Sequence, residues 1–397
     1  MDITIYPGKL SGTVQAIPSK SQAHRLLICA AFSQNPTTLI CPATNQDIEA
    51  TAGCLRALGA SITRTDNGYH IIPASQIPEQ AVLNCFESGS TLRFMLPIAA
   101  SLGVDTTFLM AGRLPDRPLS PLWEELERMG CHLSRPQDNT LHLTGKLQSG
   151  EYFIDGSVSS QFITGLLFAL MLLPGNSKLT VTGKVESTPY IRMTEEVIKL
   201  FGVPLNNYQF DHKPLLSPGT ITVEGDWSNG AFFLSAKAMG NEITVCGLDE
   251  NSAQGDKAAS RLLDSLNSLI QIQGQDIPDL IPILAVVAGN KQGAKFEGIG
   301  RLRLKESDRI QSVAQMLAAF GANVTFTEDS LTVYPAPYHC CTINANNDHR
   351  IAMAAAIGAT VADGPVTILG ADCVKKSYPD FWSEFQKLGG KYEQHIR

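Results

Sequence analysis

An internal repeat in the amino-acid sequence restricts the possible folds of this chain more than any other feature. An apolar helix is predicted six times, beginning near residues 21, 90, 160, 228, 279 and 348, in steps of 69, 70, 68, 51 and 69 residues. A strand, a polar loop, an amphipathic helix and further strand follow the apolar helix in the repeated unit. Because a helix that is apolar all round belongs inside a core, the repeat predicts an α/β fold with buried helices.

The repeat also predicts how the chain divides into domains. A chain of 397 residues is too long for one ordinary core, and six units divide most simply into three and three. The break is expected near residues 215–223, where KPLLSPG supplies Pro and Gly. The last unit lacks closing strands, while the first eighteen residues are strands without a preceding helix. We therefore predict one domain of residues 19–222 and a second of residues 1–18 with 223–397; packing of the N-terminal strands on their own domain is the alternative.

Composition and charge narrow the range of partners. Charged residues make up 17% of the chain, against about 25% in an average domain, which indicates that many segments are completely buried. A net charge of −7 argues against nucleic acid as the main partner. The longest apolar run, residues 162–173, is too short to span a bilayer, and MDITIYPG resembles a strand more than a signal peptide. Nine Cys without a CxxC pair indicate reduced thiols and a cytosolic protein.

Polar residues gather where the apolar helices begin, and helix N-termini bind anions because their free N–H groups and the helix dipole favour negative charge. Lys20 and Arg25 open the first helix, and the next acidic residue is Asp47. Candidates at helix starts are Lys20, Ser21, Arg25, Gly89, Ser90, Arg93, Ser159, Ser160, Gln161, Asn347, Asp348, His349 and Arg350. Candidates in loops are Arg113, Arg117, Ser187, Tyr190, Lys305, Arg309, Lys375 and Lys376. Cations at equivalent ends of repeated units predict a basic cleft between the domains that binds phosphate and carboxylate groups.

Each candidate also has a purely structural interpretation. A serine before a helix is often an N-cap, and an arginine in a loop is often solvated. Asp279 and Glu306 lie among the cations, where a carboxylate can accept a proton, but charge compensation or helix capping would also explain them. There is no GxxxxGK[ST] loop, no GxGxxG turn after a strand and no zinc-like Cys/His spacing, so no nucleotide, metal or other cofactor is predicted.

Nine short motifs along the chain resemble one known family, the 5-enolpyruvylshikimate-3-phosphate synthases. They are PSKSQAHR, ESGSTLR, GRLPDRP, VSSQF, VEGD, IPD, RLKESDR, NDHRIAM and KKSYPDFW, in family order over nearly the whole chain. The resemblance implies two inside-out α/β domains, each of three repeated βαβαββ-type units with buried helices, and an active site in the interdomain cleft. It also implies a cytoplasmic enzyme without a cofactor, which we expect to be a monomer.

The resemblance assigns roles to the candidate residues. The residues expected to bind shikimate 3-phosphate are Lys20, Ser21, Arg25, Ser159, Ser160, Gln161, Ser187, Tyr190, Asp279 and Lys305. The residues expected to bind phosphoenolpyruvate are Lys20, Gly89, Arg113, Gln161, Arg309, Arg350 and Lys376, the last because the family's Lys stands three residues before Pro379-Asp380. Asp279, Glu306 and Lys20 are expected to move protons.

These roles describe an addition followed by an elimination. Protonation of C3 of phosphoenolpyruvate, with Glu306 as the expected acid, makes C2 electrophilic. The 5-hydroxyl of the shikimate ligand then attacks C2, with Asp279 as the expected base. Loss of phosphate and of a proton from C3 restores the enol, and the cations stabilise the anions throughout.

Two positions depart from the family pattern. Glu87-Ser88 stands where many members have Asn before the GT pair, and an acid there would weaken the phosphoenolpyruvate subsite or point away from it. Arg301 stands where the family has an Asn that contacts the shikimate ligand. Gly89 is the residue of the glyphosate-sensitive form, so sensitivity to glyphosate is expected.

Other functions remain as alternatives. A UDP-N-acetylglucosamine enolpyruvyl transferase has the same fold and donor, but it has Lys-Asn where this chain has Lys20-Ser21, and a loop Cys that AGRLPDRP lacks. A phosphometabolite-binding protein without turnover would not need both Asp279 and Glu306. An RNA 3′-phosphate cyclase shares part of the fold but needs a nucleotide-binding His site, which is not found here.

Overall fold

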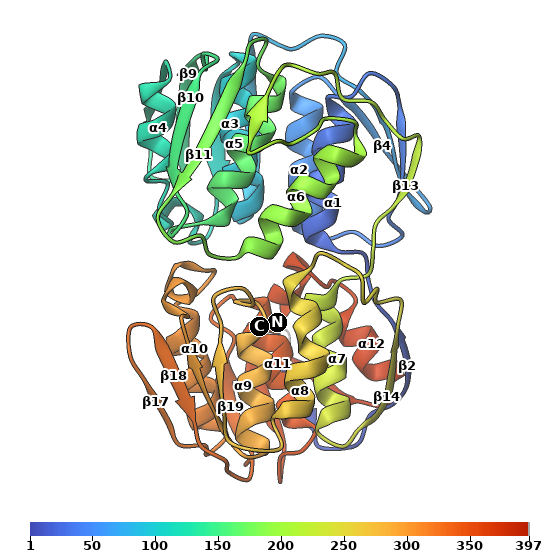
Figure 1. Ribbon diagram of the computed structural model, residues 1–397. Helices are drawn as coiled ribbons and strands as arrows, with labels where there is room; N and C mark the ends of the chain where they lie inside the picture. The colour runs from blue at the N-terminus through green and yellow to red at the C-terminus, as the bar shows by residue number, and fades with distance from the viewer. Residues whose placement is uncertain (396–397) are drawn as a thin grey trace. The chain divides into compact units, whose positions relative to one another are not determined.

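The computed structural model describes residues 1–395, and the chain is a mixed α/β protein, as predicted (Figure 1). Its contacts divide the chain into two compact units, Pro18–Val223 and Met1–Ile17 with Glu224–Arg397. Each unit has its own hydrophobic core. No helix within residues 1–395 is both long and apolar enough to span a bilayer.

The Pro18–Val223 unit contains sheets with the strand orders β13-β3-β5-β4, β6-β7-β9-β8 and β10-β11-β12. The strands are β3 (Thr37–Ile40), β4 (Ser61–Thr65), β5 (Gly68–Ile72), β6 (Gln80–Phe86), β7 (Asp105–Met110), β8 (Cys131–Ser134), β9 (Thr140–Gly145), β10 (Glu151–Asp155), β11 (Ser177–Thr182), β12 (Gln209–Phe210) and β13 (Thr220–Thr222). The helices are α1 (Lys20–Ala31), α2 (Gln46–Ala57), α3 (Gly89–Leu102), α4 (Leu122–Arg128), α5 (Ser160–Leu172), α6 (Thr188–Leu200) and the 3₁₀ turn η1 (Leu114–Asp116).

The other unit contains sheets with the orders β19-β20-β1-β21, β14-β2 and β15-β16-β18-β17. The strands are β1 (Asp2–Tyr6), β2 (Ser11–Gln15), β14 (Glu242–Cys246), β15 (Ile270–Gln273), β16 (Ala294–Glu297), β17 (Val324–Phe326), β18 (Ser330–Val333), β19 (Cys341–Asn344), β20 (Val366–Leu369) and β21 (Lys391–His395). The helices are α7 (Trp227–Ala238), α8 (Ala259–Ser265), α9 (Ile281–Asn290), α10 (Arg309–Ala319), α11 (His349–Ala359), α12 (Phe381–Lys387) and the 3₁₀ turns η2 (Gly255–Ala258), η3 (Gly300–Leu304) and η4 (Ala371–Lys376).

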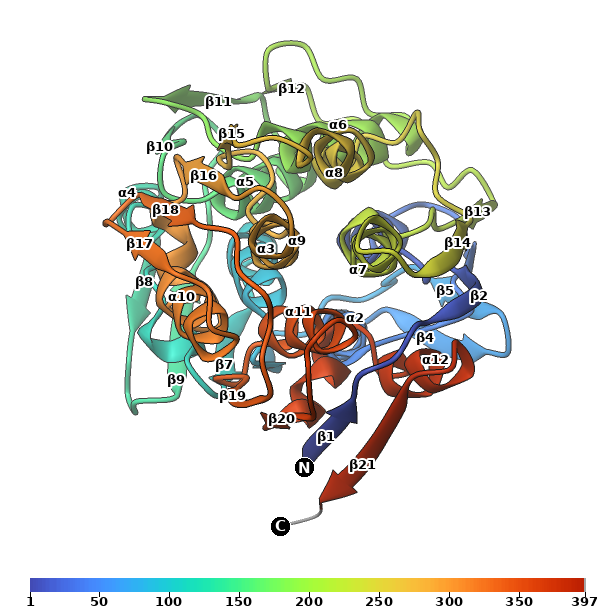
Figure 2. The same ribbon diagram turned by 90° about the horizontal axis from the view of Figure 1, so that it is seen from below.

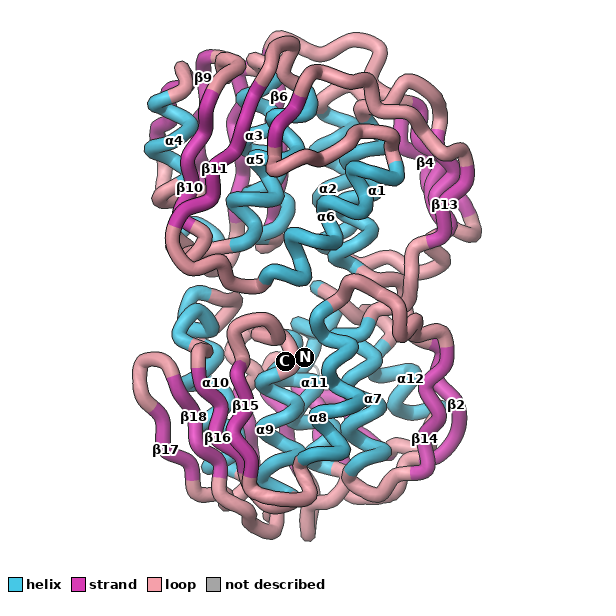
Figure 3. The backbone as a smooth tube through the Cα atoms, viewed as in Figure 1, coloured by secondary structure: helices cyan, strands magenta, loops and turns pink. Residues whose placement is uncertain are grey.

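The six apolar segments form the helices α1, α3, α5, α7, α9 and α11, and these supply most of the buried side chains. In Figure 3 most helices of each unit lie centrally with strands at the sides, while α4 lies at the outer edge. Figure 2 shows α7, α9 and α11 side by side, in agreement with their mutual contacts. Because every side of such a helix is covered by apolar neighbours, its N-terminus is the place where polar residues occur.

The two N-terminal strands pair with strands from the other end of the chain. β1 lies antiparallel between β20 and β21, and β2 runs parallel to β14. The backbone N–H and C=O groups of β1 are therefore satisfied on both edges, which an isolated strand pair would not allow. These pairings join residues 1–17 to the unit that contains Glu224–Arg397.

Gly165 marks the closest approach of two buried helices, α3 and α5. A Cβ at this position would collide with the carbonyl oxygen of Arg93 and would lie 2.8 Å from Cγ of Pro97. The absence of a side chain therefore lets the two backbones pack directly against each other. This contact also fixes the backbone of Arg93, whose side chain belongs to the candidate site described below.

We expect Gly165→Ala to lower the free energy of unfolding by about 1–3 kcal/mol, because the added methyl group forces the two helices apart. The matched control is Gly53→Ala in α2, where a Cβ would have no atom within 4 Å. That change should stabilise the chain by about 0.5–1 kcal/mol, because Ala is the better helix former. Chemical denaturation followed by circular dichroism measures both; equal effects at the two positions would contradict the close approach.

Candidate active site

In the Pro18–Val223 unit, Lys20 is the first residue of α1, which the side chain of Ser19 caps. The Lys20 Nζ donates to Oδ2 of Asp47 at 2.8 Å, and the two side chains are only 15% and 16% exposed. Asp47 lies in the first turn of α2. The first acidic residue after Lys20 in the sequence is therefore the anion that its ammonium group meets in this structure.

Arg25 lies one turn further along α1, and its guanidinium group is 3% exposed. It donates to the carbonyl oxygens of Ser21 at 2.6 Å and Tyr190 at 2.9 Å, and to the hydroxyl of Thr194 at 2.8 Å. Burial lowers the pKa of Arg25 to about 10. None of its hydrogen-bond partners within residues 1–395 carries a charge, so its positive charge is available to an anion.

Ser187 precedes α6 in the left-handed conformation, with φ of 55°, and is buried. Its side chain makes no capping hydrogen bond to α6, although Ser is a common N-cap. Its carbonyl oxygen accepts from the N–H of Tyr190 at 3.0 Å. The structure thus brings the predicted residues Ser21, Arg25 and Tyr190 together, with Ser187 beside them in a strained backbone that often marks functional sites.

Gln161 at the start of α5 is held by two hydrogen bonds to α3. Its Oε1 accepts from Nη1 of Arg93 at 3.0 Å, and its Nε2 donates to the hydroxyl of Ser90 at 2.9 Å. The Ser159 hydroxyl caps α5 by accepting from the N–H of Gln161. The N-cap role that a serine before a helix often has therefore applies to Ser159. The neighbouring Ser160 is buried in the first turn.

Gly89 faces two guanidinium groups. A Cβ at this position would lie 2.6 Å from Nη1 of Arg117 and 2.7 Å from Nη1 of Arg93. The two cations therefore approach the N-terminus of α3, which itself attracts anions. The carboxylate of Glu87 packs against the backbone of Gly112, in the loop that follows β7.

Arg113 is exposed in the loop before η1, and its side chain makes no hydrogen bond or ion pair within residues 1–395.

In the other unit, Arg309 is completely buried and donates to three carboxylates at once. Its Nη1 lies 3.0 Å from Asp279 and its Nη2 lies 2.6 Å from Glu306. Its Nε lies 2.9 Å from Asp348, which also caps α11. Burial opposes the charge of Arg309, but Asp348, Glu306 and Asp279 outweigh it and raise the pKa of the guanidinium group.

Asp279 contacts two further cations that the sequence singled out. Its Oδ2 accepts from Nη2 of Arg350 at 3.0 Å, and its Oδ1 lies 4.0 Å from Nζ of Lys305. Burial by itself would raise the pKa of Asp279, but the charges of Arg350, Lys305 and Arg309 hold it well below its ordinary value. Burial lowers the pKa of Lys305 to about 8, against the attraction of Asp279.

The fifth apolar helix was expected to begin near residue 279, and it begins two residues later. α9 begins at Ile281, and the residue before it, Leu280, makes no side-chain cap. The carboxylate of Asp279 is instead directed to Arg309 and Arg350. Charge compensation, one of the structural interpretations of Asp279, is therefore observed.

Lys376 ends η4 and is buried, whereas Lys375 is exposed. The Lys376 Nζ donates to the carbonyl oxygen of Asn347 at 2.7 Å. Asn346 and Asn347 both have left-handed backbones, with φ of 52° and 55°. This double turn presents the Asn347 carbonyl next to the N-terminus of α11, where His349 and Arg350 begin the helix.

Asp256 is a neighbour of this cluster that the sequence did not indicate. Asp256 is 2% exposed in η2 and accepts a hydrogen bond from the hydroxyl of Ser228. Burial and the nearby charge of Asp279 raise the pKa of Asp256 to about 7. An acid in a short polar loop gives no sequence signal of burial, so only the tertiary structure reveals it.

Arg301 lies near enough to Lys305 to lower the pKa of Lys305.

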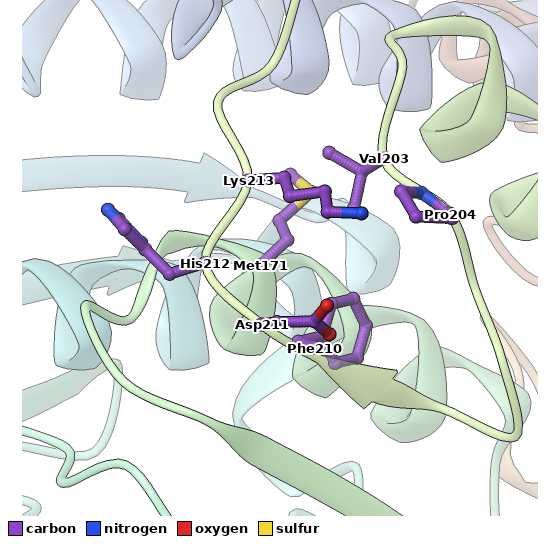
Figure 4. Close-up of a pocket in the computed structure, with 7 residues that line it drawn as sticks. All are labelled: Met171, Val203, Pro204, Phe210, Asp211, His212 and Lys213. Atoms are coloured by element: carbon purple, nitrogen blue, oxygen red, sulfur yellow. The ribbon is translucent and has the colours of Figure 1, made fainter.

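A shallow pocket elsewhere in the Pro18–Val223 unit is separate from these residues (Figure 4). It is lined by Met171, Val203, Pro204, Phe210, Asp211, His212 and Lys213. Met171 is at the C-terminal end of α5, about 17 Å along the helix from Ser160. The pocket therefore contains none of the candidate residues. Within residues 1–395, no three His, Cys, Asp or Glu side chains are grouped as metal ligands.

The family model of EPSP synthase (3-phosphoshikimate 1-carboxyvinyltransferase) matches residues 5–275 and 260–385 of the chain. The chain belongs to this family. A 3-phosphoshikimate 1-carboxyvinyltransferase of Clostridium kluyveri is 37% identical over 99% of this chain and 98% of its own length. The resemblance inferred from the nine motifs is thereby confirmed.

Solved structures agree with this assignment at the level of the fold. An EPSP synthase from Acinetobacter baumannii matches 99% of this chain and 100% of its own with a TM-score of 0.80 and 22% identity. The enolpyruvyl transferase NikO from Streptomyces tendae matches 100% of this chain and 99% of its own with a TM-score of 0.75 and 16% identity. Two EPSP-synthase-family signatures, IPD and RLKESDR, supply Asp279, Glu306 and Arg309 of the buried cluster.

We expect Asp279→Asn to lower the free energy of unfolding by about 2–4 kcal/mol at pH 7, because Arg350 loses its carboxylate. A carboxyl whose pKa is depressed by folding stabilises the protein above its unfolded pKa, near 4, and less as the pH falls below that value. The difference between wild type and variant should therefore be full at pH 6–7 and should shrink below about pH 4.

Urea denaturation at several pH values measures this difference. Asp264→Asn, at an exposed position of α8, is the control and should change stability by less than about 0.5 kcal/mol. A difference that stays constant down to pH 3 would contradict the ionised state of Asp279.

Proposed function

We propose that this chain transfers the enolpyruvyl group of phosphoenolpyruvate to the 5-hydroxyl of shikimate 3-phosphate and releases phosphate. It is a 3-phosphoshikimate 1-carboxyvinyltransferase, which catalyses step six of the shikimate pathway toward chorismate and the aromatic amino acids. The observation that carries the proposal is the full-length relationship to this enzyme family. The grouping of carboxylates and cations around Arg309 supports it, because addition and elimination both need proton transfer among anions.

The Pro18–Val223 unit supplies Lys20 and Arg25, two of the three cations expected to bind shikimate 3-phosphate, and the other unit supplies Lys305. Arg25 is buried, and its hydrogen bonds go to neutral oxygens. A phosphate or carboxylate would therefore interact with a guanidinium charge that no carboxylate in hydrogen-bond contact neutralises. Tyr190 and Ser187 lie beside it at the start of α6. Gln161 has its amide orientation fixed by Arg93 and Ser90, which suits it to position a ligand rather than to react.

Arg309, Arg350 and Lys376 are the expected ligands of phosphoenolpyruvate in the other unit. All three are buried, and in this structure the two arginines are neutralised by carboxylates. A bound trianion would compete with those carboxylates for the guanidinium groups. We infer that substrate binding weakens the hold of the arginines on Asp279 and Glu306.

This competition explains how strongly paired carboxylates could exchange protons. The low pKa of Asp279 makes it a weak base as long as Arg350 and Arg309 neutralise it. When the substrate's negative charge offsets those cations, protonation of the carboxyl groups becomes easier. Glu306 then serves as the acid toward C3, and Asp279 accepts the proton of the 5-hydroxyl.

The finer features of the fold belong to the same proposal. The compact units would be two domains, residues 19–222 and residues 1–18 with 223–397, each composed of three βαβαββ-type units. The expected ligands of both substrates are divided between the units, so the reaction would need both. A cytoplasmic monomer without a cofactor is proposed, and the nine free cysteines suit a reducing compartment.

The purified protein should release phosphate from phosphoenolpyruvate when shikimate 3-phosphate is present. It should release none when UDP-N-acetylglucosamine is the acceptor. Asp279→Asn and Glu306→Gln should each lower kcat by about 10²–10⁴-fold, because each removes a proton-transfer group. A phosphate-release assay measures these rates, and Glu328→Gln, at a carboxylate that is 93% exposed, is the control.

Each result has a distinct meaning. Release with the sugar nucleotide would favour the rival enolpyruvyl transferase. A folded protein that binds shikimate 3-phosphate without turnover would favour the phosphometabolite-binding alternative. Full activity in both carboxylate variants would overturn the assigned proton transfers while leaving the reaction itself in place.

Glyphosate should inhibit the wild-type enzyme, and Gly89→Ala should weaken this inhibition by about 10–200-fold. The added methyl group would lie within 2.7 Å of the guanidinium groups of Arg93 and Arg117, so that they must move. The KM for phosphoenolpyruvate should rise as well, because the same groups face its subsite. Inhibition curves for the two proteins measure the change; a wild-type enzyme as insensitive as a known tolerant one would contradict the prediction.

A further inference from the structure

The dipoles of helices α1 and α2 favour the ion pair between Lys20 and Asp47. Lys20 begins α1, so its ammonium group lies at the positive end of the helix dipole, where a cation is disfavoured. Asp47 lies in the first turn of α2, where the dipole favours a carboxylate. The 2.8 Å contact therefore stabilises a charge that α1 alone would oppose.

Buried hydrogen bonds fix the position of Asp47. Thr51, one turn further along α2, contacts Nδ1 of His24 on α1 at 2.7 Å and the hydroxyl of Thr91 on α3 at 2.8 Å. Thr91 in turn donates to the hydroxyl of Ser88, the cap of α3, at 2.8 Å. All four side chains are buried. The helix that carries Asp47 is thus held against the two helices that begin with Lys20 and Gly89.

We propose that Asp47 is a positioning residue for the transferase reaction, holding the Lys20 ammonium group charged and in place while phosphoenolpyruvate binds. This rests on the proposed function, in which Lys20 contacts that substrate. An ammonium group has three N–H donors, so a bond to Asp47 does not prevent a bond to the substrate. A partly buried carboxylate at 2.8 Å favours the charged form of Lys20, and its loss makes deprotonation easier.

The other titratable groups around Lys20 do not replace Asp47. On α1, His24 is buried, and burial with the charges of Lys20 and Arg25 holds its pKa well below the ordinary value, so it stays neutral. Arg25 is itself a cation. α6 presents Tyr190, β3 has no titratable side chain, and Tyr69 of β5 is hydrogen bonded to Glu49. Within the Pro18–Val223 unit, Asp47 places a negative charge in direct contact with Lys20.

The test is the pH dependence of kcat/KM for phosphoenolpyruvate between pH 6 and pH 9, at saturating shikimate 3-phosphate. In Asp47→Asn the alkaline limb of the profile, where kcat/KM falls as the pH rises, should move to lower pH by about one unit. At a given alkaline pH this is about a tenfold loss of kcat/KM. Asp47→Glu keeps the charge and should keep the limb close to its wild-type position. Asp66→Asn, an exposed acid in the turn between β4 and β5, is the matched control and should leave the profile unchanged.

Lys20→Arg separates charge from structure, because a guanidinium group stays protonated over this pH range. In the Lys20→Arg variant, the fall in kcat/KM at alkaline pH that is due to residue 20 should be absent. Adding Asp47→Asn to this variant should not shift its pH profile. A profile of Asp47→Asn parallel to wild type, or a shift of equal size in Asp47→Glu, would overturn the proposal. Tighter binding of phosphoenolpyruvate with unchanged kcat would also overturn it, because Asp47 would then compete with the substrate. No turnover by wild type would instead refute the proposed function.

Discussion

A helix that is buried on every side can present polar groups only at its ends, and this constraint determines where chemistry occurs in this chain. α3, α5 and α11 are surrounded by apolar side chains over almost their whole lengths. Their N-termini, with free N–H groups, are the positions where a polar residue costs little and an anion is attracted. Gly89, Ser160 and Arg350 each stand at such a position. Burial of these helices thus leaves their N-termini as the places where an anion would be attracted.

The two units use this geometry in different electrostatic ways. In the Pro18–Val223 unit, Arg25 is bonded only to neutral oxygens, so its charge can act on a ligand directly. In the other unit, Arg309 is bonded to three carboxylates and Arg350 to one of the same three. The first arrangement suits binding of a phosphate ester. The second suits proton transfer, because a ligand can change the charge on the carboxylates by engaging the arginines.

The sequence predicted the α/β fold, the six buried helices and the side chains at their N-termini, because these follow from periodicity and from the needs of helix ends. It did not predict the partners of those side chains. Lys20 and Asp47 are 27 residues apart, and Arg309 and Asp348 are 39 apart, so their contacts depend on how helices pack. Asp256 was missed because nothing in a short polar loop reveals burial. Ser159, by contrast, caps its helix as serine before a helix commonly does.

Arg309 shows why folding and chemistry depend on the same residues here. Only a guanidinium group can donate through three nitrogens to three carboxylates, and a lysine at this fully buried position would leave at least one acid poorly satisfied. Asp348 belongs to the fold, because it also caps α11. Asp279 and Glu306 occupy its two terminal nitrogens, so an anion that binds Arg309 would compete with them for its charge. We propose that substrate binding at Arg309 weakens its hold on Asp279 and Glu306, the groups expected to transfer protons.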